Sequence, residues 1–518
     1  MVTTARRVRG LVIRSALGKA EKMTTTELLI IGSGPVGSAF ARLVGEQRPG
    51  TGITMVELGP QVSTPAGTNV RNLPVAERDA ARERSQGPQG AARGDSLRGL
   101  QVEGTIISPG GTYLASPGHQ PGMPAAALSS CVGGMGVHWT CATPRPNDDE
   151  RIAEIPADEL DSALDEAERL MKVTTLPENP YGSAIKSLLR EHFEGVLPED
   201  RLPDGLPMSA MPQADGSIRW GGADTILGET PVTLRTETIA RRLVLDGARV
   251  VGAEVEHLPT GEVETIEAKA VVVAAKAMQT PQLLWASGIR PDALGRYLTE
   301  HVLVYSVVAL KDEIVERAGI DVSVKDLVKD PTASTFGIPY TAGLHPYRTQ
   351  VMHMADAPFP VDESAVHVGA ARFVAMGNGV RKFPRPEDRL VFSETEKDGW
   401  GMPQLSIEYE VTDRELAEVE RASADLRAVA ESIGSFVPGG EPRLMPAGTS
   451  LHYKGTVRMG DDGGAASVVD TRSRVWGFEN LFLGGNGLIP TATVTNPTLT
   501  SVALAVRAAP TLVEELDA

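Results

Sequence analysis

The sequence contains few cysteines, few aromatic residues and no long apolar run. Only two of its 518 residues are cysteines, Cys131 and Cys141. A secreted protein of this size that relied on disulfides would carry more, so we expect a reducing, cytoplasmic location. No apolar run approaches the roughly 20 residues of a spanning helix. Residues 1–22 are basic with only short apolar patches, so we expect a disordered or non-native start there rather than a signal peptide.

An excess of positive charge is also absent. The chain has 50 Lys and Arg against 67 Asp and Glu, a formal net charge of -17. A field of that sign repels phosphate backbones and anionic lipid, so neither a nucleic-acid nor a membrane partner is expected. The nine histidines are scattered without the spacing of metal ligands, and no metal site is predicted.

A glycine-rich turn stands between a predicted strand at 27–31 and a predicted helix at 36–44. In this setting the G-x-G-x-x-G pattern of residues 32–37 indicates a dinucleotide site, because the glycines allow a tight turn, close approach of a pyrophosphate and packing of the helix on the strand. A second strand, 53–56, ends at Glu57, whose carboxylate suits ribose hydroxyls and disfavours a 2′-phosphate. The ligand is therefore FAD or NAD. The predicted contacts are Gly32, Gly34, Pro35, Val36, Gly37 and Glu57.

The segments after residue 150 predict further helices and strands, some of which belong to the same domain as the glycine-rich turn. Residues 150–171 have an amphipathic helix pattern and residues 411–433 a charged helix pattern. Residues 199–224 are typical of a linker or lid, and residues 498–515 predict a final helix. Residues 233–270 alternate, with a hairpin turn at Thr260–Gly261, and lead into the apolar run 271–275, which suits a strand buried on both faces. Another short strand is predicted at 481–483.

A dense run of small residues, CVGGMGVHWTCATPRP at 131–146, fits neither an ordinary helix nor a strand. It resembles the flavin-attachment motif of pyranose oxidases, a branch of the glucose-methanol-choline (GMC) oxidoreductases. The resemblance implies FAD, with His138 bonded to the flavin 8α carbon or packed beside the ring, and Thr140 near N5. Gly134 and Met135, in the same motif, are further expected contacts of the FAD. Cys131 and Cys141 are expected to be buried small side chains rather than a redox pair.

The C-terminal region carries a second part of this resemblance. His452 lies in an H-x-x-G-T pattern, and Asn496 follows 44 residues later, before the final helix. In GMC enzymes such a pair is catalytic, which implies that His452 accepts the substrate proton and Asn496 holds the substrate oxygen. Oxidation of an alcohol by a flavin needs such a base as hydride leaves the carbon. Asn486, in a Gly-Asn-Gly turn, and Thr498 are further expected cofactor contacts.

The substrate side resembles pyranose oxidases less closely. Gln350 matches a sugar-contacting glutamine and Arg372 a substrate-side arginine, whereas the loop at 354–360 departs from the family pattern and contains two prolines. An altered substrate side is similar to bacterial glycoside oxidases, which act at ring C3 of C- or O-glycosides. Neither specificity for free glucose nor the tetramer of fungal pyranose oxidases is therefore predicted for this chain. The oligomeric state stays open.

Together these features predict an α/β protein with a Rossmann-like FAD-binding domain, discontinuous in sequence, and an α+β substrate domain on an antiparallel sheet. The FAD-binding domain is assigned to 23–150, 225–302 and 450–518, and the substrate domain to 151–224 and 303–449. The expected activity is oxidation of a secondary ring hydroxyl, at C3 or C2, of a glycoside, with O2 or a quinone as electron acceptor. The alternatives are a free-pyranose 2-oxidase, a lyase of the same fold and a non-catalytic flavin-binding module.

Overall fold

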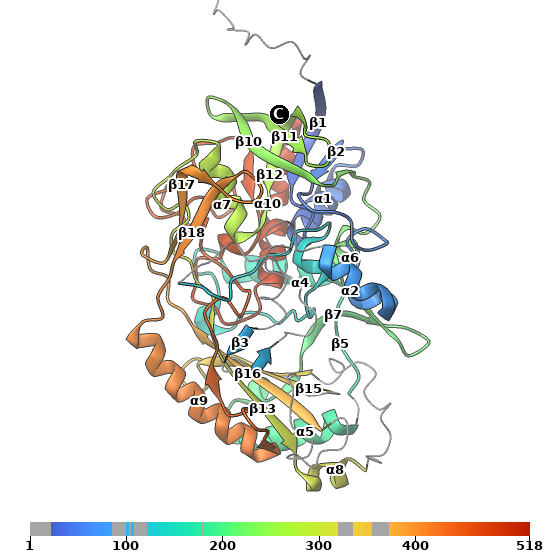
Figure 1. Ribbon diagram of the computed structural model, residues 1–518, viewed down its shortest axis with the longest axis vertical. Helices are drawn as coiled ribbons and strands as arrows, with labels where there is room; N and C mark the ends of the chain where they lie inside the picture. Colours follow the sequence, from blue (N-terminus) through green and yellow to red (C-terminus); the bar gives the residue numbers. More distant parts are fainter. Residues whose placement is uncertain are drawn as a thin grey trace, which may run out of the picture.

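The computed structural model describes residues 22–84, 100–102, 105–107, 122–178, 180–319, 335–354 and 372–518. Two large sheets lie one above the other along the long axis of the molecule (Figure 1). Of the predicted disordered or non-native start, residues 1–21 lie outside the described residues, whereas Lys22 already belongs to the first strand.

The upper sheet has a parallel centre. Apolar runs at 28–31 and 271–273 are buried on both faces, as parallel strands require. Strand β12 pairs in parallel with β1 and β21, and β2 pairs in parallel with β1 and β9. Ile31, Val56 and Val273 are in register at the carboxyl edge, so the segments that follow them meet there. The strands are β1 (Lys22–Ile31), β2 (Ile53–Val56), β9 (Thr233–Arg235), β10 (Thr238–Asp246), β11 (Arg249–His257), β12 (Glu262–Val273) and β21 (Leu481–Leu483).

Strand β1 begins five residues before the predicted strand at 27–31. The threonine-rich residues 24–26 are β-branched, and the register of β1 against β12 continues through them to Lys22. The predicted turn at Thr260–Gly261 is confirmed: it joins β11 to β12, and Gly261 has a φ of +65°. The predicted strands at 53–56 and 481–483 are also confirmed.

Helices cover the upper sheet. The C-terminal helix α10 packs against both α1 and α4 (Figure 1). The predicted helix at 150–171 starts only at Ala157, because Pro156 precedes it and residues 148–150 form a separate 3-10 turn. The helices of this half are α1 (Pro35–Gln47), α2 (Val75–Arg84), α4 (Ala157–Met171), α6 (Ala223–Leu227), α7 (Lys276–Ala286) and α10 (Thr498–Asp517).

The lower sheet is antiparallel, as predicted for the substrate half, with the order β19-β13-β16-β15-β14-β6 and β20 beside β13. Helix α9 contacts β13 and β16 and, with α5 and α8, closes one apolar cluster under this sheet (Figure 1). The strands are β6 (Asp204–Gly205), β13 (His301–Leu310), β14 (Thr335–Ile338), β15 (Tyr347–Met354), β16 (Phe373–Arg381), β19 (Gly434–Phe436) and β20 (Arg443–Leu444). The helices are α5 (Pro180–Phe193), α8 (Asp312–Ala318) and α9 (Asp413–Ile433).

Three small sheets complete the part of the fold that the described residues form. The segment 199–224, interpreted as a linker or lid, instead supplies β6 and the hairpin β7–β8, whose strands are too short and proline-flanked to show a clear alternation. The predicted domain boundaries stay predictions. The strands are β3 (Leu100–Val102) with β4 (Thr105–Ile107), β5 (Val173–Thr175) with β7 (Pro207–Pro212) and β8 (Ile218–Trp220), and β17 (Arg389–Lys397) with β18 (Pro403–Glu408).

Candidate active site

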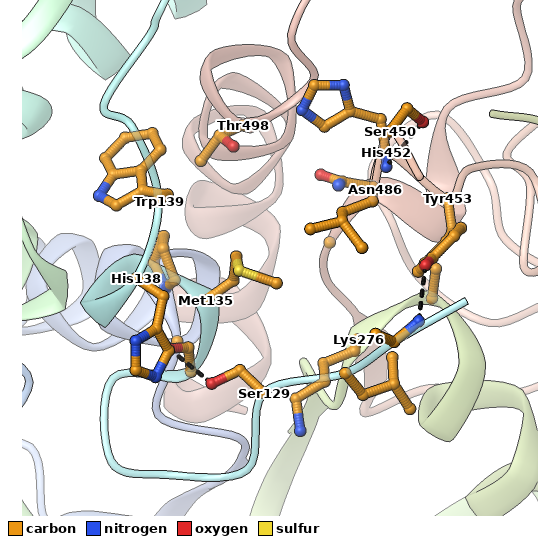
Figure 2. Close-up of a pocket in the computed structure, with 18 of the residues that line it drawn as sticks. Ser129, Met135, His138, Trp139, Lys276, Ser450, His452, Tyr453, Asn486 and Thr498 are labelled. Carbon is orange, nitrogen blue, oxygen red and sulfur yellow. Dashed lines mark hydrogen bonds between the residues drawn. The ribbon is translucent and has the colours of Figure 1, made fainter. Parts of the chain in front are cut away.

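A cavity of about 500 Å³ is lined by residues of both large sheets. Every site residue predicted from the sequence lines it except Gly37 and Arg372. The cavity therefore brings together the glycine turn, the 131–140 loop, strand β15 and the C-terminal segment, which are far apart in the chain. Figure 2 shows His138 and Met135 on one side of it and His452 and Tyr453 on the other.

The glycine turn after β1 has the shape that a dinucleotide needs. Gly32 has a φ of +109°, and a Cβ there would lie 2.4 Å from the Ala274 carbonyl oxygen. A Cβ on Gly37 would lie 2.0 Å from the Gly32 carbonyl oxygen, so Gly37 serves the packing of α1 rather than the cavity wall. Helix α1 starts at Pro35, and its free N–H groups point toward the turn. These residues fit a bound pyrophosphate.

Glu57 closes the same edge of the sheet. Its carboxylate accepts hydrogen bonds from the backbone N–H and the hydroxyl of Ser33, at 3.1 and 2.8 Å, and from the Gly59 N–H at 3.1 Å. These bonds hold the buried carboxylate at the cavity wall, where it fits the adenosine ribose of FAD.

Replacing Glu57 by glutamine is expected to weaken FAD binding by about tenfold or more, since a charged acceptor is replaced by a neutral amide. The FAD content of the purified protein, from its visible-to-ultraviolet absorbance ratio, measures this. Glu267→Gln, on β12 and outside the cavity, is the control that should keep full FAD content.

The loop predicted to face the flavin packs directly on the glycine turn. The Gly133 N–H donates to the Ser33 hydroxyl at 2.9 Å, and a Cβ on Gly134 would lie 3.3 Å from Gly34 Cα. His138 is buried at the cavity wall, and its Nε2 lies 3.8 Å from the Cys131 sulfur. The loop thus holds His138 and Thr140 against the space beyond the pyrophosphate site.

The two cysteines are buried and no disulfide joins them. Burial raises the pKa of the Cys131 thiol to about 12, so the thiol stays protonated beside His138. This agrees with the prediction that they pack as small side chains.

His452 is paired with a second histidine. Its Nδ1 lies 3.1 Å from Nδ1 of His301, and the ring centroids are 4.5 Å apart. Burial, and then the charge of Lys454, lower the pKa of His452 to about 3, and burial lowers that of His301 well below its usual value. Both rings are neutral, so one Nδ1 donates and the other accepts. Nε2 of His452 is available to a ligand, because no hydrogen bond to this nitrogen forms among the described residues.

The pH profile of kcat/KM follows from this pKa. Because the neutral form of His452 persists down to about pH 3, activity should show no acid limb near the usual histidine pKa of 6.5. Lys454→Met removes a charge that lowers the pKa of His452, so the acid limb of the kcat/KM profile of this variant should lie at higher pH than in the wild type. A wild-type limb near 6.5 that is unchanged in Lys454→Met would contradict this assignment.

Asn496 is positioned by a buried carboxylate. Glu150 accepts the Val494 and Thr495 N–H groups at 2.6 and 2.9 Å and the hydroxyls of Thr493 and Thr495 at 3.0 and 2.7 Å. These four bonds fix the three residues that precede Asn496. The Asn496 side chain then faces the cavity together with His452.

Of the two substrate contacts predicted by resemblance, one lines the cavity and the other does not. Gln350 lies on β15 and lines the cavity. Arg372 does not line it, and its guanidinium pairs with Asp312. Of the altered loop at 354–360, residues 355–360 lie outside the described residues.

Four residues that line the cavity or hold its wall in place were not predicted as site residues; of these, Lys276, Arg348 and His301 line it and Glu150 does not. Lys276 begins α7 just after the buried run of β12, with Nζ 2.8 Å from Gln279 Oε1 and its side chain at the cavity wall (Figure 2). Its position at the carboxyl edge of a parallel strand was an available signal. Arg348 stands two residues before Gln350, on the same strand face. Glu150 and His301 act through residues distant in sequence, which no local pattern reveals.

Comparison with known proteins decides the family. The GMC oxidoreductase profile matches residues 148–303 and 386–505. A C-glycoside 3-oxidase of Microbacterium trichothecenolyticum is 39% identical over 510 residues, covering 95% of this chain and 97% of the relative. The chain belongs to the GMC oxidoreductase family. It is an FAD-dependent enzyme that acts on CH–OH groups, as the sequence predicted.

Other relatives of this GMC oxidoreductase agree. A C-glycoside 3-oxidase of Arthrobacter globiformis is 38% identical, with 95% of each chain covered. A pyranose 2-oxidase of Tricholoma matsutake is 31% identical, covering 95% of this chain and 94% of the relative. Among solved structures, a formate oxidase matches with a TM-score of 0.66 at 14% identity, covering 95% of this chain and 99% of that one. This last likeness supports the fold alone.

Two further features bear on partners. Among the described helices, none combines the length and apolar character needed to cross a membrane. The described residues also contain no group of three His, Cys, Asp or Glu side chains suited to a metal ion. The cytoplasmic location stays a prediction.

Proposed function

We propose that this GMC oxidoreductase oxidises a secondary ring hydroxyl of a C- or O-glycoside to the ketone, at C3 of the sugar. The observation that carries the proposal is the full-length likeness to the two C-glycoside 3-oxidases, at 39% and 38% identity. The cavity supports it, because His452 and Asn496 face it together with Gln350.

The residues divide the chemistry among them. Bound FAD supplies the acceptor for the hydride that leaves the carbon, with O2, giving H2O2, or a quinone as the final electron acceptor. His452 accepts the hydroxyl proton at Nε2, and its neutral state makes that nitrogen a base at working pH. The bond to His301 fixes the plane of the His452 ring. Asn496 donates to the substrate oxygen, held in place by the loop that Glu150 binds.

A covalent bond from His138 to the flavin is part of the proposal. The ring is buried at the cavity wall, in a loop that packs on the glycine turn. Acid precipitation tests it: flavin that stays with the wild-type protein but leaves His138→Ala supports the bond. Flavin released from both proteins would leave His138 as a packing contact.

Steady-state kinetics with matched sugars tests the substrate class. We expect a C-glycoside and an O-glycoside to have higher kcat/KM than free glucose, and NMR of the product to locate the ketone at C3. The likeness to the Tricholoma pyranose 2-oxidase favours the second candidate, a free-pyranose 2-oxidase. Preference for glucose with a ketone at C2 would select that candidate. Conversion without flavin reduction would select a lyase, and no conversion a binding module.

A further inference from the structure

Arg348 is a buried cation at the substrate side of the cavity. It lies on β15, is 6% exposed and lines the cavity. Its Nε has no hydrogen-bond partner, and no carboxylate among the described residues forms an ion pair with its guanidinium. Among the other buried cations, Arg507 bonds Glu159 at 2.7 Å and Lys382 bonds Asp388 at 2.6 Å, whereas Lys454 donates to the His452 carbonyl oxygen at 3.3 Å. An unpaired buried charge is costly, so its retention points to a ligand.

Arg348 has a glycine beside it on both neighbouring strands, and one of these, Gly337, leaves room for its guanidinium. Gly379 of β16 is its register partner, and a Cβ there would lie 3.5 Å from His301 Nδ1. On β14, a Cβ on Gly337 would lie 3.0 Å from a terminal guanidinium nitrogen. The guanidinium therefore occupies a hollow in the sheet, between β14 and the His301 end of the cavity.

No carboxylate among the described residues makes a direct ion pair with Arg348. Glu150 is the acidic neighbour that acts on its pKa, but that carboxylate is already engaged by four hydrogen bonds from residues 493–495. Burial lowers the pKa of Arg348 to about 10, which leaves it protonated at neutral pH. The one carboxylate among the described residues lining the cavity is Glu57, at the glycine-turn end.

We propose that Arg348 binds a carboxylate of the substrate, so that the preferred substrates are acidic glycosides. The inference rests on the proposed function and narrows its substrate class. A guanidinium offers a carboxylate two parallel N–H donors, and the pairing supplies the directly bonded carboxylate partner that no described residue provides. The carboxylate belongs either to the sugar, as in a glucuronide, or to the aglycone.

Two matched substrate pairs distinguish these sources: methyl glucoside with methyl glucuronide, and phenyl glucoside with 4-carboxyphenyl glucoside. We expect the acidic member of one pair to have the higher kcat/KM in the wild type. Arg348→Met should lower that value by about 10- to 100-fold, with less than about a threefold change for the neutral member, and Arg348→Lys should restore part of the loss. Arg381→Met, on β16 and outside the cavity, should change neither.

Preference for the neutral member of both pairs, or an equal loss for both members in Arg348→Met, would overturn the proposal. Calorimetric titration with methyl glucuronide and with 4-carboxyphenyl glucoside gives a readout that does not need turnover. If no glycoside is oxidised, the proposed function fails, and the role of Arg348 is tested by binding alone. Binding of either ligand to the wild type and Arg348→Lys but not to Arg348→Met supports the site. Equal binding of the ligands by the wild type and Arg348→Met, or no binding of either ligand, rejects the proposal. A flavin spectrum like that of the wild type shows that each variant is folded.

Discussion

Replacing His452 by glutamine is expected to lower kcat by about 10²- to 10⁴-fold while FAD stays bound. Glutamine keeps a polar side chain of similar length but cannot take up a proton, and general-base catalysis contributes an effect of about this size. The change removes the proton acceptor without touching the glycine turn or Glu57, so the flavin spectrum should be preserved. Stopped-flow measurement of flavin reduction isolates the chemical step.

The control for this variant is His192→Gln, an exposed histidine near the end of α5. It should reduce the flavin at the wild-type rate. A His452→Gln enzyme that retains kcat within about tenfold of the wild type would show that another group takes the proton. His301, whose Nδ1 lies 3.1 Å from Nδ1 of His452 in the wild type, would then be the first group to examine.

Replacing Glu150 by glutamine is expected to lower kcat by about 10- to 100-fold, with little change in KM. The carboxylate accepts two N–H groups and two hydroxyls from residues 493–495, and an amide cannot accept all of them. The loop should shift and take the Asn496 side chain away from the substrate oxygen. Glu150 is thus a positioning residue, acting through Asn496.

A merely structural role for Glu150 makes a different prediction. In that case Glu150→Gln would lower the melting temperature while leaving the kcat of the remaining folded enzyme unchanged. Asp158→Asn, at an exposed carboxylate on α4, is the matched control and should change neither quantity. Asn496→Ala combined with Glu150→Gln should cost little more than Asn496→Ala alone, because both remove the same contact.

The sequence was most informative where function depends on neighbouring residues. The glycine turn at 32–37, the loop around His138 and the pair His452 and Asn496 are each read from a short pattern, and of the contacts predicted from them all but Gly37 line one cavity. Gly37 shows why a motif residue need not touch the ligand, since its missing side chain lets α1 approach Gly32.

The sequence was least informative where contacts join distant segments. Glu150 and the loop 493–495 are separated by most of the chain, and nothing near either segment predicts that four bonds link them. Arg372 and Arg348 illustrate the same difficulty on one sheet. Resemblance pointed to Arg372, whose guanidinium is paired with Asp312 outside the cavity, whereas Arg348 lines the cavity without an ion pair.

Flavin-mediated oxidation of a glycoside can be followed in an anaerobic absorption spectrum. A C-glycoside is added to the purified holoenzyme without oxygen, and the visible flavin absorbance is followed. The absorbance is expected to bleach with the C-glycoside, faster than with free glucose, and His452→Gln is expected to slow the bleaching by about 10²-fold or more. A bound flavin that never bleaches with any glycoside would contradict the proposed function.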